Sequence, residues 1–239
     1  MTTTADDIAK QAAGEAAARL ATDGMCLGLG TGSTTAWALA ALGRRVQEEG
    51  LRIRGVPTSF AAERLARRVG IPLTSLDAVE RLDLALDGAD EVSPALDLIK
   101  GRGAAHTREK VVAAQADRFV VLVDPSKLVD RLGTRAAVPV EVLPMATSPV
   151  MRALERLGGA PELRMGQGKD GPVVTDQGFW VVDVRFADGI DDPVDLGRAI
   201  KALPGVLDHG LFLGMATEAL IGRPDGTVER LRPAGTPAP

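Results

Sequence analysis

The stretch Leu82-Asp-Leu-Ala-Leu-Asp-Gly-Ala-Asp-Glu-Val92 indicates the fold class of this chain. An apolar run that ends in acids and a glycine is typical of a buried strand opening onto a crevice. In open α/β sheets, ligands bind at the carboxyl ends of such strands. The segment Ile99-Lys-Gly-Arg-Gly-Ala-Ala-His-Thr-Arg-Glu-Lys110 then adds a lysine, a glycine-rich turn and another acid. We therefore predict that residues 82–110 place proton-moving carboxylates beside groups that hold negative charge.

Short apolar strands alternate with helical patterns through the first half of the chain, which predicts a parallel sheet covered on both faces. The continuous apolar run Phe119-Val-Val-Leu-Val123 fits a strand buried on both sides. Strands are predicted at 25–29, 52–56, 82–86 and 119–123, and helices at 6–21, 34–47, 59–69 and 104–115.

After Gly133 the order of predicted elements becomes β-α-β-β-α-β, the split-βαβ pattern of a small α+β domain. The apolar segment 214–221 can then rejoin the first sheet, and residues 231–239 are predicted to form a loose tail. The six elements of the second part are predicted at 138–143, 149–157, 161–165, 179–186, 193–203 and 206–213.

The composition is that of an ordinary globular protein of 239 residues, with 45% hydrophobic residues and a net charge of −4. The negative charge and scarce aromatic residues argue against nucleic acid as a partner. No basic and apolar leader precedes the first helix, and no apolar run reaches the length of a membrane span. We therefore expect a cytoplasmic protein with no membrane partner. Cys26 is the only cysteine and is predicted to be a small core side chain, and one Cys with two distant His is too few for a metal site.

The glycine-rich segment Gly28-Leu-Gly-Thr-Gly-Ser-Thr-Thr35 is a candidate phosphate site. Glycines let backbone N–H groups approach an anion, and a helix that begins there adds unpaired N–H groups. The dinucleotide pattern G-x-G-x-x-G fails here, and no Gly-Lys-Ser/Thr of a nucleotide P-loop exists. The alternative is a tight turn in which Ser33 or Thr34 caps the helix.

The acids and lysines after the other strands are weaker candidates when each is taken alone. Asp87 and Asp90 can converge if the chain turns at Gly88, or they can form a solvated acidic turn. Lys100-Gly-Arg-Gly103 is either a second anion site or a polar loop. Glu109 alone fits a surface acid in the first turns of a helix. Solvated side chains are the alternative for Lys127 and Lys10, and structural or loop roles are favoured for His106 and His209.

Taken together, these segments resemble the type A ribose 5-phosphate isomerase family. The matching pieces run in family order over nearly the whole chain, and the ordered set is far more specific than any single piece. They are Gly28–Thr35, Asp87–Glu91, Ile99–Ala105, Thr107–Lys110, Asp124–Lys127, Pro139–Pro144, Leu203–Val206 and Gly210–Phe212.

The resemblance implies an α/β fold in which a Rossmann-like sheet domain carries an inserted ferredoxin-like α+β domain. We place the first domain at residues 1–133 and 210–239, and the second at 134–209. The implied activity is the interconversion of ribose 5-phosphate and ribulose 5-phosphate through an enediolate, without metal or cofactor. The family also implies a homodimer or homotetramer.

The resemblance further implies roles for individual residues. Glu109 matches the catalytic base, and Asp87, Asp90 and Lys100 match the other polar groups of the active site. Arg102 departs from the glycine that is common at its position, so we predict that it has ordinary negative φ and supplements phosphate binding. The substrate-binding set is Thr31, Gly32, Ser33, Thr34, Asp87, Gly88, Ala89, Asp90, Lys100, Gly101, Arg102, Gly103 and Lys127, with Lys10 as a less certain phosphate contact.

Two alternative functions remain open from the sequence. A sugar-phosphate lactonase or deaminase on a similar fold would share a phosphate loop, although the whole constellation at 87–109 is not expected there. A sugar-phosphate-sensing module of a transcription regulator would need a DNA-binding segment. Only about 20 residues precede the first predicted strand, too few for a helix-turn-helix domain.

Overall fold

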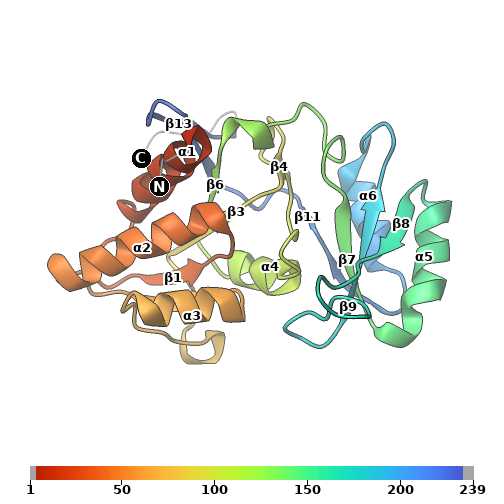
Figure 1. Cartoon of the computed structure of the whole chain (residues 1–239), viewed down its shortest axis with the longest axis horizontal. Helices are drawn as coiled ribbons and strands as arrows, with labels where there is room; N and C mark the ends of the chain where they lie inside the picture. The colour runs from red at the N-terminus through yellow and green to blue at the C-terminus, as the bar shows by residue number, and fades with distance from the viewer. Residues whose placement is uncertain (1–3, 234–239) are drawn as a thin grey trace. The chain divides into compact units, whose positions relative to one another are not determined.

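The computed structural model describes residues 4–233, which form two compact units (Figure 1). The first unit comprises the chain up to Ala89, Arg108–Leu128, and the chain from Gly214 onward. The second comprises Asp90–Thr107 and Val129–Leu213. Across residues 4–233, every helix is too short or too polar to cross a membrane.

The first unit contains a six-stranded sheet with the order β13-β12-β6-β3-β1-β2. Neighbouring strands run parallel except for the hairpin of β12 and β13, so the predicted parallel sheet is confirmed, as is the return of the chain to it after residue 214. The strands are β1 (Cys26–Leu29), β2 (Arg54–Pro57), β3 (Leu84–Gly88), β6 (Phe119–Val123), β12 (Glu218–Gly222) and β13 (Val228–Leu231).

Helices cover both faces of this sheet, with α1 and α2 on one side and α3 and α4 on the other (Figure 1). The core between α1, α2 and the sheet is built from alanine and leucine. Gly14 lets α1 approach α2 closely, because a Cβ at that position would lie 2.6 Å from Trp37 Cβ. The helices are α1 (Ala5–Ala18), α2 (Ser33–Glu48), α3 (Phe60–Arg68) and α4 (His106–Ala114), with short 3₁₀ turns η1 (Leu76–Ala78) and η2 (Pro125–Lys127).

The second unit follows the predicted order β-α-β-β-α-β and forms an antiparallel sheet with the order β10-β7-β9-β8. Val150 and Leu154 of α5 and Ile200 of α6 pack on valines of β7 and β9 to form its core. The elements are β7 (Val138–Val142), η3 (Pro144–Ala146), α5 (Thr147–Arg156), β8 (Ala160–Leu163), β9 (Trp180–Arg185), α6 (Pro193–Lys201) and β10 (Val206–His209).

A small third sheet, with the order β11-β5-β4, was not predicted. It consists of β4 (Glu91–Val92), β5 (Leu98–Ile99) and β11 (Leu211–Phe212). The single strand predicted at 206–213 is therefore wrong, because the chain breaks at Gly210 and changes sheets. A Cβ at Gly210 would lie 2.1 Å from the Lys100 carbonyl oxygen. This sheet groups residues 90–107 with the second unit, whereas the predicted domain boundaries placed them in the first.

The predicted loose tail at 231–239 begins one residue too early, because Leu231 ends β13. The turn Asp225-Gly226 between β12 and β13 is a typical hairpin signal, although β13 was not predicted. Residues 234–239 of that predicted tail lie outside the described residues.

Glu91 is a fully buried carboxylate that holds the loop preceding β7. Its Oε2 accepts the Gly133 N–H at 2.6 Å, and its Oε1 accepts those of Arg135 and Ala136, each at 2.6 Å. Three N–H donors satisfy the buried charge. Glu91, which belongs to the predicted acidic turn, therefore has a structural role.

We expect Glu91→Gln to lower the free energy of unfolding by about 2–3 kcal/mol, since a neutral amide weakens charge-assisted bonds and turns a donor toward backbone N–H groups. Urea denaturation at pH 7 measures this change. Glu162→Gln, at an exposed position of β8, is the matched control and should change stability by less than about 0.5 kcal/mol. Equal stability of the two variants would contradict the assignment.

Cys26 lies buried in β1, as predicted, and burial raises the pKa of its thiol above the usual range. We therefore expect a chromogenic disulfide reagent at pH 8 to titrate this thiol at least about tenfold more slowly in the native protein than in urea, because both access and the thiolate fraction are reduced. Equal rates in the two conditions would show that the strand is open.

Candidate functional site

Asp87 is the last residue but one of β3 and lies beside the glycine-rich loop that follows β1 in the first unit. Its Oδ1 accepts the Thr31 N–H at 3.0 Å and the Gly88 N–H at 2.8 Å. Gly30 makes this approach possible, because a Cβ there would lie 2.3 Å from that same oxygen. The predicted meeting of the acid and the phosphate loop at one sheet edge is therefore observed within the first unit.

The start of α2 differs from the capping alternative, in which Ser33 or Thr34 caps the helix. The N-cap is Gly32, at φ 127°, and no side chain caps the first turn. Gly32 and Ser33 are exposed and Thr34 is buried. An α-helix begins with N–H groups that have no partner within the helix, and its dipole favours an anion there. This geometry suits a phosphate group.

A cluster of hydroxyl groups beside this loop was not predicted. Thr31 Oγ1 lies 2.9 Å from Thr58 Oγ1 and 2.6 Å from Ser59 Oγ. Thr58 and Ser59 are both buried, and Ser59 also accepts the Ala62 N–H as the cap of α3. The available signal was the Thr58-Ser59 pair, which one residue separates from the strand predicted at 52–56.

Glu109 lies buried in the first turn of α4. Val112, one turn further along the helix, packs so closely on β1 that a Cβ at Gly28 would lie 2.6 Å from its Cγ1. Residues at i and i+3 share a helix face, so Glu109 is on the side of α4 that faces the sheet. The Leu82 N–H donates to the Gln115 carbonyl at 2.9 Å, which places the end of α4 at the start of β3. The helix therefore begins at the carboxyl edge, where Asp87 also lies.

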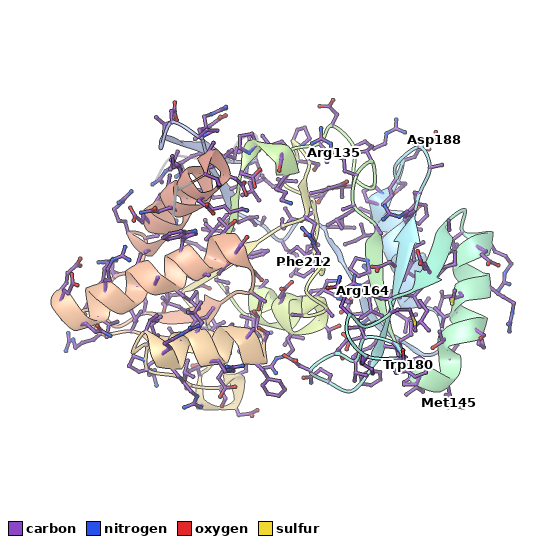
Figure 2. All side chains as sticks on the ribbon, viewed as in Figure 1. Arg135, Met145, Arg164, Trp180, Asp188 and Phe212 are labelled. Carbon is purple, nitrogen blue, oxygen red and sulfur yellow. The ribbon has the colours of Figure 1, made fainter. Side chains whose placement is uncertain are left out.

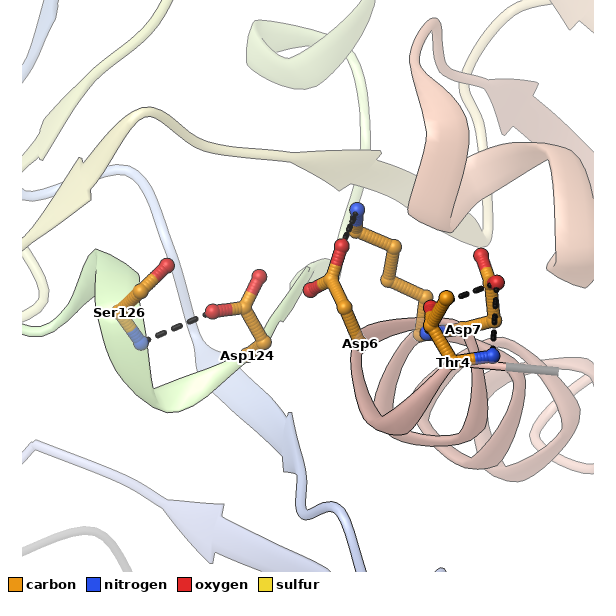
Figure 3. Close-up of polar contacts among 6 residues, drawn as sticks. Thr4, Asp6, Asp7, Asp124 and Ser126 are labelled. Carbon is orange, nitrogen blue, oxygen red and sulfur yellow. Dashed lines mark hydrogen bonds and ion pairs between the residues drawn. The ribbon is translucent and has the colours of Figure 1, made fainter.

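Two lysines lie near the same edge of the first sheet. The start of α1 contacts the end of β12, because a Cβ at Gly222 would meet the Ala9 carbonyl oxygen at 1.8 Å. Lys10 follows Ala9 directly, and its ammonium pairs with the Asp6 carboxylate. Lys127 ends the turn η2, which Asp124 caps by accepting the Ser126 N–H at 2.8 Å (Figure 3).

The capping of α1 fixes the helix that carries Lys10. Thr4 and Asp7 form a reciprocal capping box at its start (Figure 3). The hydrogen bonds from the Thr4 hydroxyl and backbone lower the pKa of Asp7, so this carboxylate stays charged at the positive end of the helix dipole.

Asp90, Lys100 and the turn at 101–103 lie together in the second unit. Asp90 Oδ2 accepts the Arg102 N–H at 3.0 Å, and the Asp90 N–H donates to the Ile99 carbonyl at 2.8 Å. Lys100 is only 2% exposed, and its ammonium lies 5.4 Å from the centre of the Phe212 ring. The arrangement keeps a cation at the turn in a poorly hydrated setting, where charge acts strongly.

The backbone of the turn is tightly determined. Gly101 has φ 110°, and a Cβ there would lie 2.6 Å from Pro139 and 2.8 Å from His106, so only glycine fits. Arg102 is not among the positive-φ residues, which confirms the prediction of ordinary φ for this departure from the family pattern. The left-handed position instead belongs to Ala104, at φ 58°. An alanine there costs about 1–2 kcal/mol, which marks a locally strained segment.

The structure thus brings the predicted site residues together in two sets. The first unit gathers Asp87, Glu109 and residues 31–34 at one sheet edge, with Lys10 and Lys127, and the second gathers Asp90, Lys100 and residues 101–103. Only Gly88 and Ala89 separate Asp87 from Asp90 in the chain. His209 has a structural contact, because its Nδ1 accepts the Leu211 N–H at 3.2 Å. Between residues 4 and 233, no three His, Cys, Asp or Glu side chains are placed to share a metal ion.

Curated relatives match this chain over nearly its whole length. Ribose-5-phosphate isomerase A of Gloeothece citriformis is 56% identical over 225 residues, covering 93% of this chain and 94% of that protein. Ribose-5-phosphate isomerase A of Thermosynechococcus vestitus is 59% identical over 214 residues, covering 89% and 90%.

Solved structures agree with the sequence relatives. Ribose 5-phosphate isomerase A of Methanocaldococcus jannaschii superimposes with a TM-score of 0.90 at 46% identity, covering 95% of this chain and 98% of that one. A D-ribose-5-phosphate isomerase in complex with phospho-erythronic acid gives 0.92 at 43% identity, covering 97% and 100%. The model of the family ribose 5-phosphate isomerase A (phosphoriboisomerase A) matches residues 54–226. With these matches and the loops described above, the chain belongs to the ribose 5-phosphate isomerase A family.

Proposed function

We propose that this chain interconverts D-ribose 5-phosphate and D-ribulose 5-phosphate by moving one proton between C1 and C2, with Glu109 as the base. The isomerase activity follows from family membership, and the residue roles are our assignment. The observation that carries the assignment is the burial of Glu109 at the same sheet edge as the glycine loop and Asp87. A buried carboxylate at that edge can reach a sugar whose phosphate lies on the start of α2.

The phosphate is assigned to the loop at 31–34. The uncapped first turn of α2 supplies N–H donors, and the hydroxyls of Ser33 and Thr34 supply further ones. Lys10 and Lys127 add positive charge near that edge. Binding energy gained at this remote group orients C1 and C2 toward the base, which lowers the entropic part of the barrier.

The proton transfer uses one carboxylate twice. Glu109 removes the proton from C2 of the aldose, which leaves an enediolate, and returns it to C1 to give the ketose. Lys100 and the N–H groups of 101–103 are assigned to the oxygen on which negative charge develops. Asp87 or Asp90 passes the hydroxyl proton between the two sugar oxygens and assists ring opening. Gly88, Ala89 and the glycines of the turn allow the backbone to approach the sugar.

We also make proposals about the domains, the cellular location and the assembly of this protein. We propose that residues 1–133 with 210–239 fold as a Rossmann-like domain and that residues 134–209 fold as an inserted ferredoxin-like domain. We also propose that the protein acts in the cytoplasm on a free sugar phosphate. A homodimer or homotetramer is the assembly that the family suggests.

We expect Glu109→Gln to lower kcat for ribose 5-phosphate by about 10²–10⁴-fold, because the amide is isosteric but cannot accept the C2 proton. Binding of phospho-erythronic acid, followed by calorimetry, should persist. Glu48→Gln, at an exposed position of α2, is the matched control and should keep full activity. Near-normal turnover of the Glu109 variant would eliminate the assignment.

We expect Arg102→Ala to raise KM for ribose 5-phosphate about three- to tenfold with little change in kcat, since an exposed guanidinium contributes long-range attraction to the phosphate. The difference from the unmodified protein should shrink as salt rises from 20 to 500 mM. Arg198→Ala, on the exposed face of α6, serves as the charge-matched control. An unchanged KM at low salt would refute a role for Arg102 in binding.

Product analysis separates the isomerase from the lactonase and deaminase alternatives. Incubation of the protein with ribose 5-phosphate in deuterated water should yield ribulose 5-phosphate with deuterium at C1 to the extent that the base exchanges its proton with solvent. Release of ammonia from an amino sugar phosphate, or hydrolysis of a sugar-phosphate lactone, without isomerisation would favour those alternatives.

A further inference from the structure

Arg164 directly follows β8 and is labelled in Figure 2. Its guanidinium contacts the carbonyl oxygens of the turn at 101–103. Its Nη1 donates to the carbonyl oxygens of both Gly101 and Arg102, each at 3.0 Å. Arg164 is mostly buried and belongs to the same unit as the turn. One guanidinium nitrogen therefore holds two consecutive peptide groups by their oxygens.

The orientation of these peptides follows from their trans geometry, in which the C=O and N–H of one peptide point in opposite directions. The Gly101 carbonyl faces Arg164, so the Arg102 N–H of that peptide faces away, and there it meets Asp90 Oδ2 at 3.0 Å. The Arg102 carbonyl also faces Arg164, so the Gly103 N–H is turned to the side on which Asp90 lies. Both donors thus point the same way.

Asp183 holds Arg164 in this position. Its Oδ2 accepts from Arg164 Nε at 2.7 Å and its Oδ1 accepts from Nη2 at 2.5 Å, a bidentate pair. Asp183 lies in β9, opposite Pro139 of β7, and Pro139 packs against Gly101. The Arg164 N–H also donates to the Val181 carbonyl at 2.9 Å. The antiparallel sheet therefore fixes Arg164 both at its backbone and at its guanidinium.

We propose that Arg164 is a positioning residue for the isomerisation. By holding the two carbonyls, it aims the Gly103 N–H at the enediolate oxygen and keeps the Arg102 N–H on the Asp90 carboxylate. This inference rests on the proposed function. It adds a residue that does not touch the substrate but holds the turn at 101–103 in place. Lysine cannot replace the group, since an ammonium lacks the planar fork that binds a carboxylate on one side and two carbonyls on the other. Preorganised donors of this kind act mainly on the transition state.

The test compares Arg164→Lys with the unmodified protein in kcat, KM and the affinity for two anions. Phospho-erythronic acid, the ligand of one solved relative, carries a carboxylate that resembles the planar, charged enediolate, whereas inorganic phosphate probes only the phosphate site. We expect kcat to fall about tenfold or more. The loss should be smaller than the roughly 10²–10³-fold loss that follows complete removal of an oxyanion donor, because the N–H groups remain and only their orientation is relaxed. Phospho-erythronic acid should bind about tenfold more weakly, with KM and phosphate inhibition unchanged within about twofold.

Two further variants make the result specific. Arg131→Lys removes another arginine of the same unit that bonds a carbonyl, that of Asp188, but does not touch the turn, and it should leave all four quantities unchanged. Asp183→Asn should reproduce the kcat loss of Arg164→Lys, and the double variant should be no worse than either single one. If Arg164→Lys fails to fold, Asp183→Asn alone carries the test.

Normal kcat in folded Arg164→Lys, or equal weakening of both anions, would overturn the inference. Additive losses in the double variant would overturn it as well, because the two side chains would then act separately. The proposed function fails separately: it is lost only if the unmodified protein does not isomerise ribose 5-phosphate, or if Glu109→Gln turns over normally.

Discussion

The hydrogen bond from the Thr31 N–H to Asp87 Oδ1 couples the carboxyl ends of two neighbouring parallel strands. It forms only because Gly30 has no side chain, since a Cβ there would occupy the place of the carboxylate. Asp87 is nearly fully buried, and a buried carboxylate needs donors to offset its lost hydration. The glycine loop supplies one, so the acid and the start of α2 are fixed by the same contact. The loop to which we assign the phosphate and the Asp87 carboxylate are therefore held in one fixed geometry within this unit.

In the second unit, side chains hold the backbone of the turn at 101–103, to which we assign oxyanion-stabilising N–H groups. Arg164 and Asp90 take opposite sides of the Gly101–Arg102 peptide, and Gly101 is packed too tightly for any other residue. The left-handed φ of Ala104 persists because these contacts over-determine the turn. Rigid donors need no reorganisation when charge develops, which is the condition under which N–H groups stabilise an oxyanion best.

The sequence predicted the elements whose signals are local. The apolar run 119–123 matches β6 to the residue, and the alternation of strands and helices gave the parallel sheet and both long helices that cover one face of it. Two-residue strands such as β4 and β5 carry no periodic signal, and only tertiary pairing with β11 defines them. The candidate site residues could be recognised in the sequence as acids and lysines that follow predicted strands. Arg164 and Thr58 did not, since what joins them to the site is a contact across 63 and 27 residues, respectively.

Lys100 and Glu109 are ionisable side chains that the fold buries, one in each unit. Burying an ammonium or a carboxylate is costly, and a fold that needed only stability would place apolar side chains at both positions. The same low dielectric that makes burial costly strengthens every interaction with charge that develops on a substrate. The centre of the Phe212 ring lies 5.4 Å from the Lys100 ammonium, and the π face of the ring offsets part of the cost of burying the cation. A buried cation in this setting is what the role we propose for Lys100, stabilising charge on a sugar oxygen, requires.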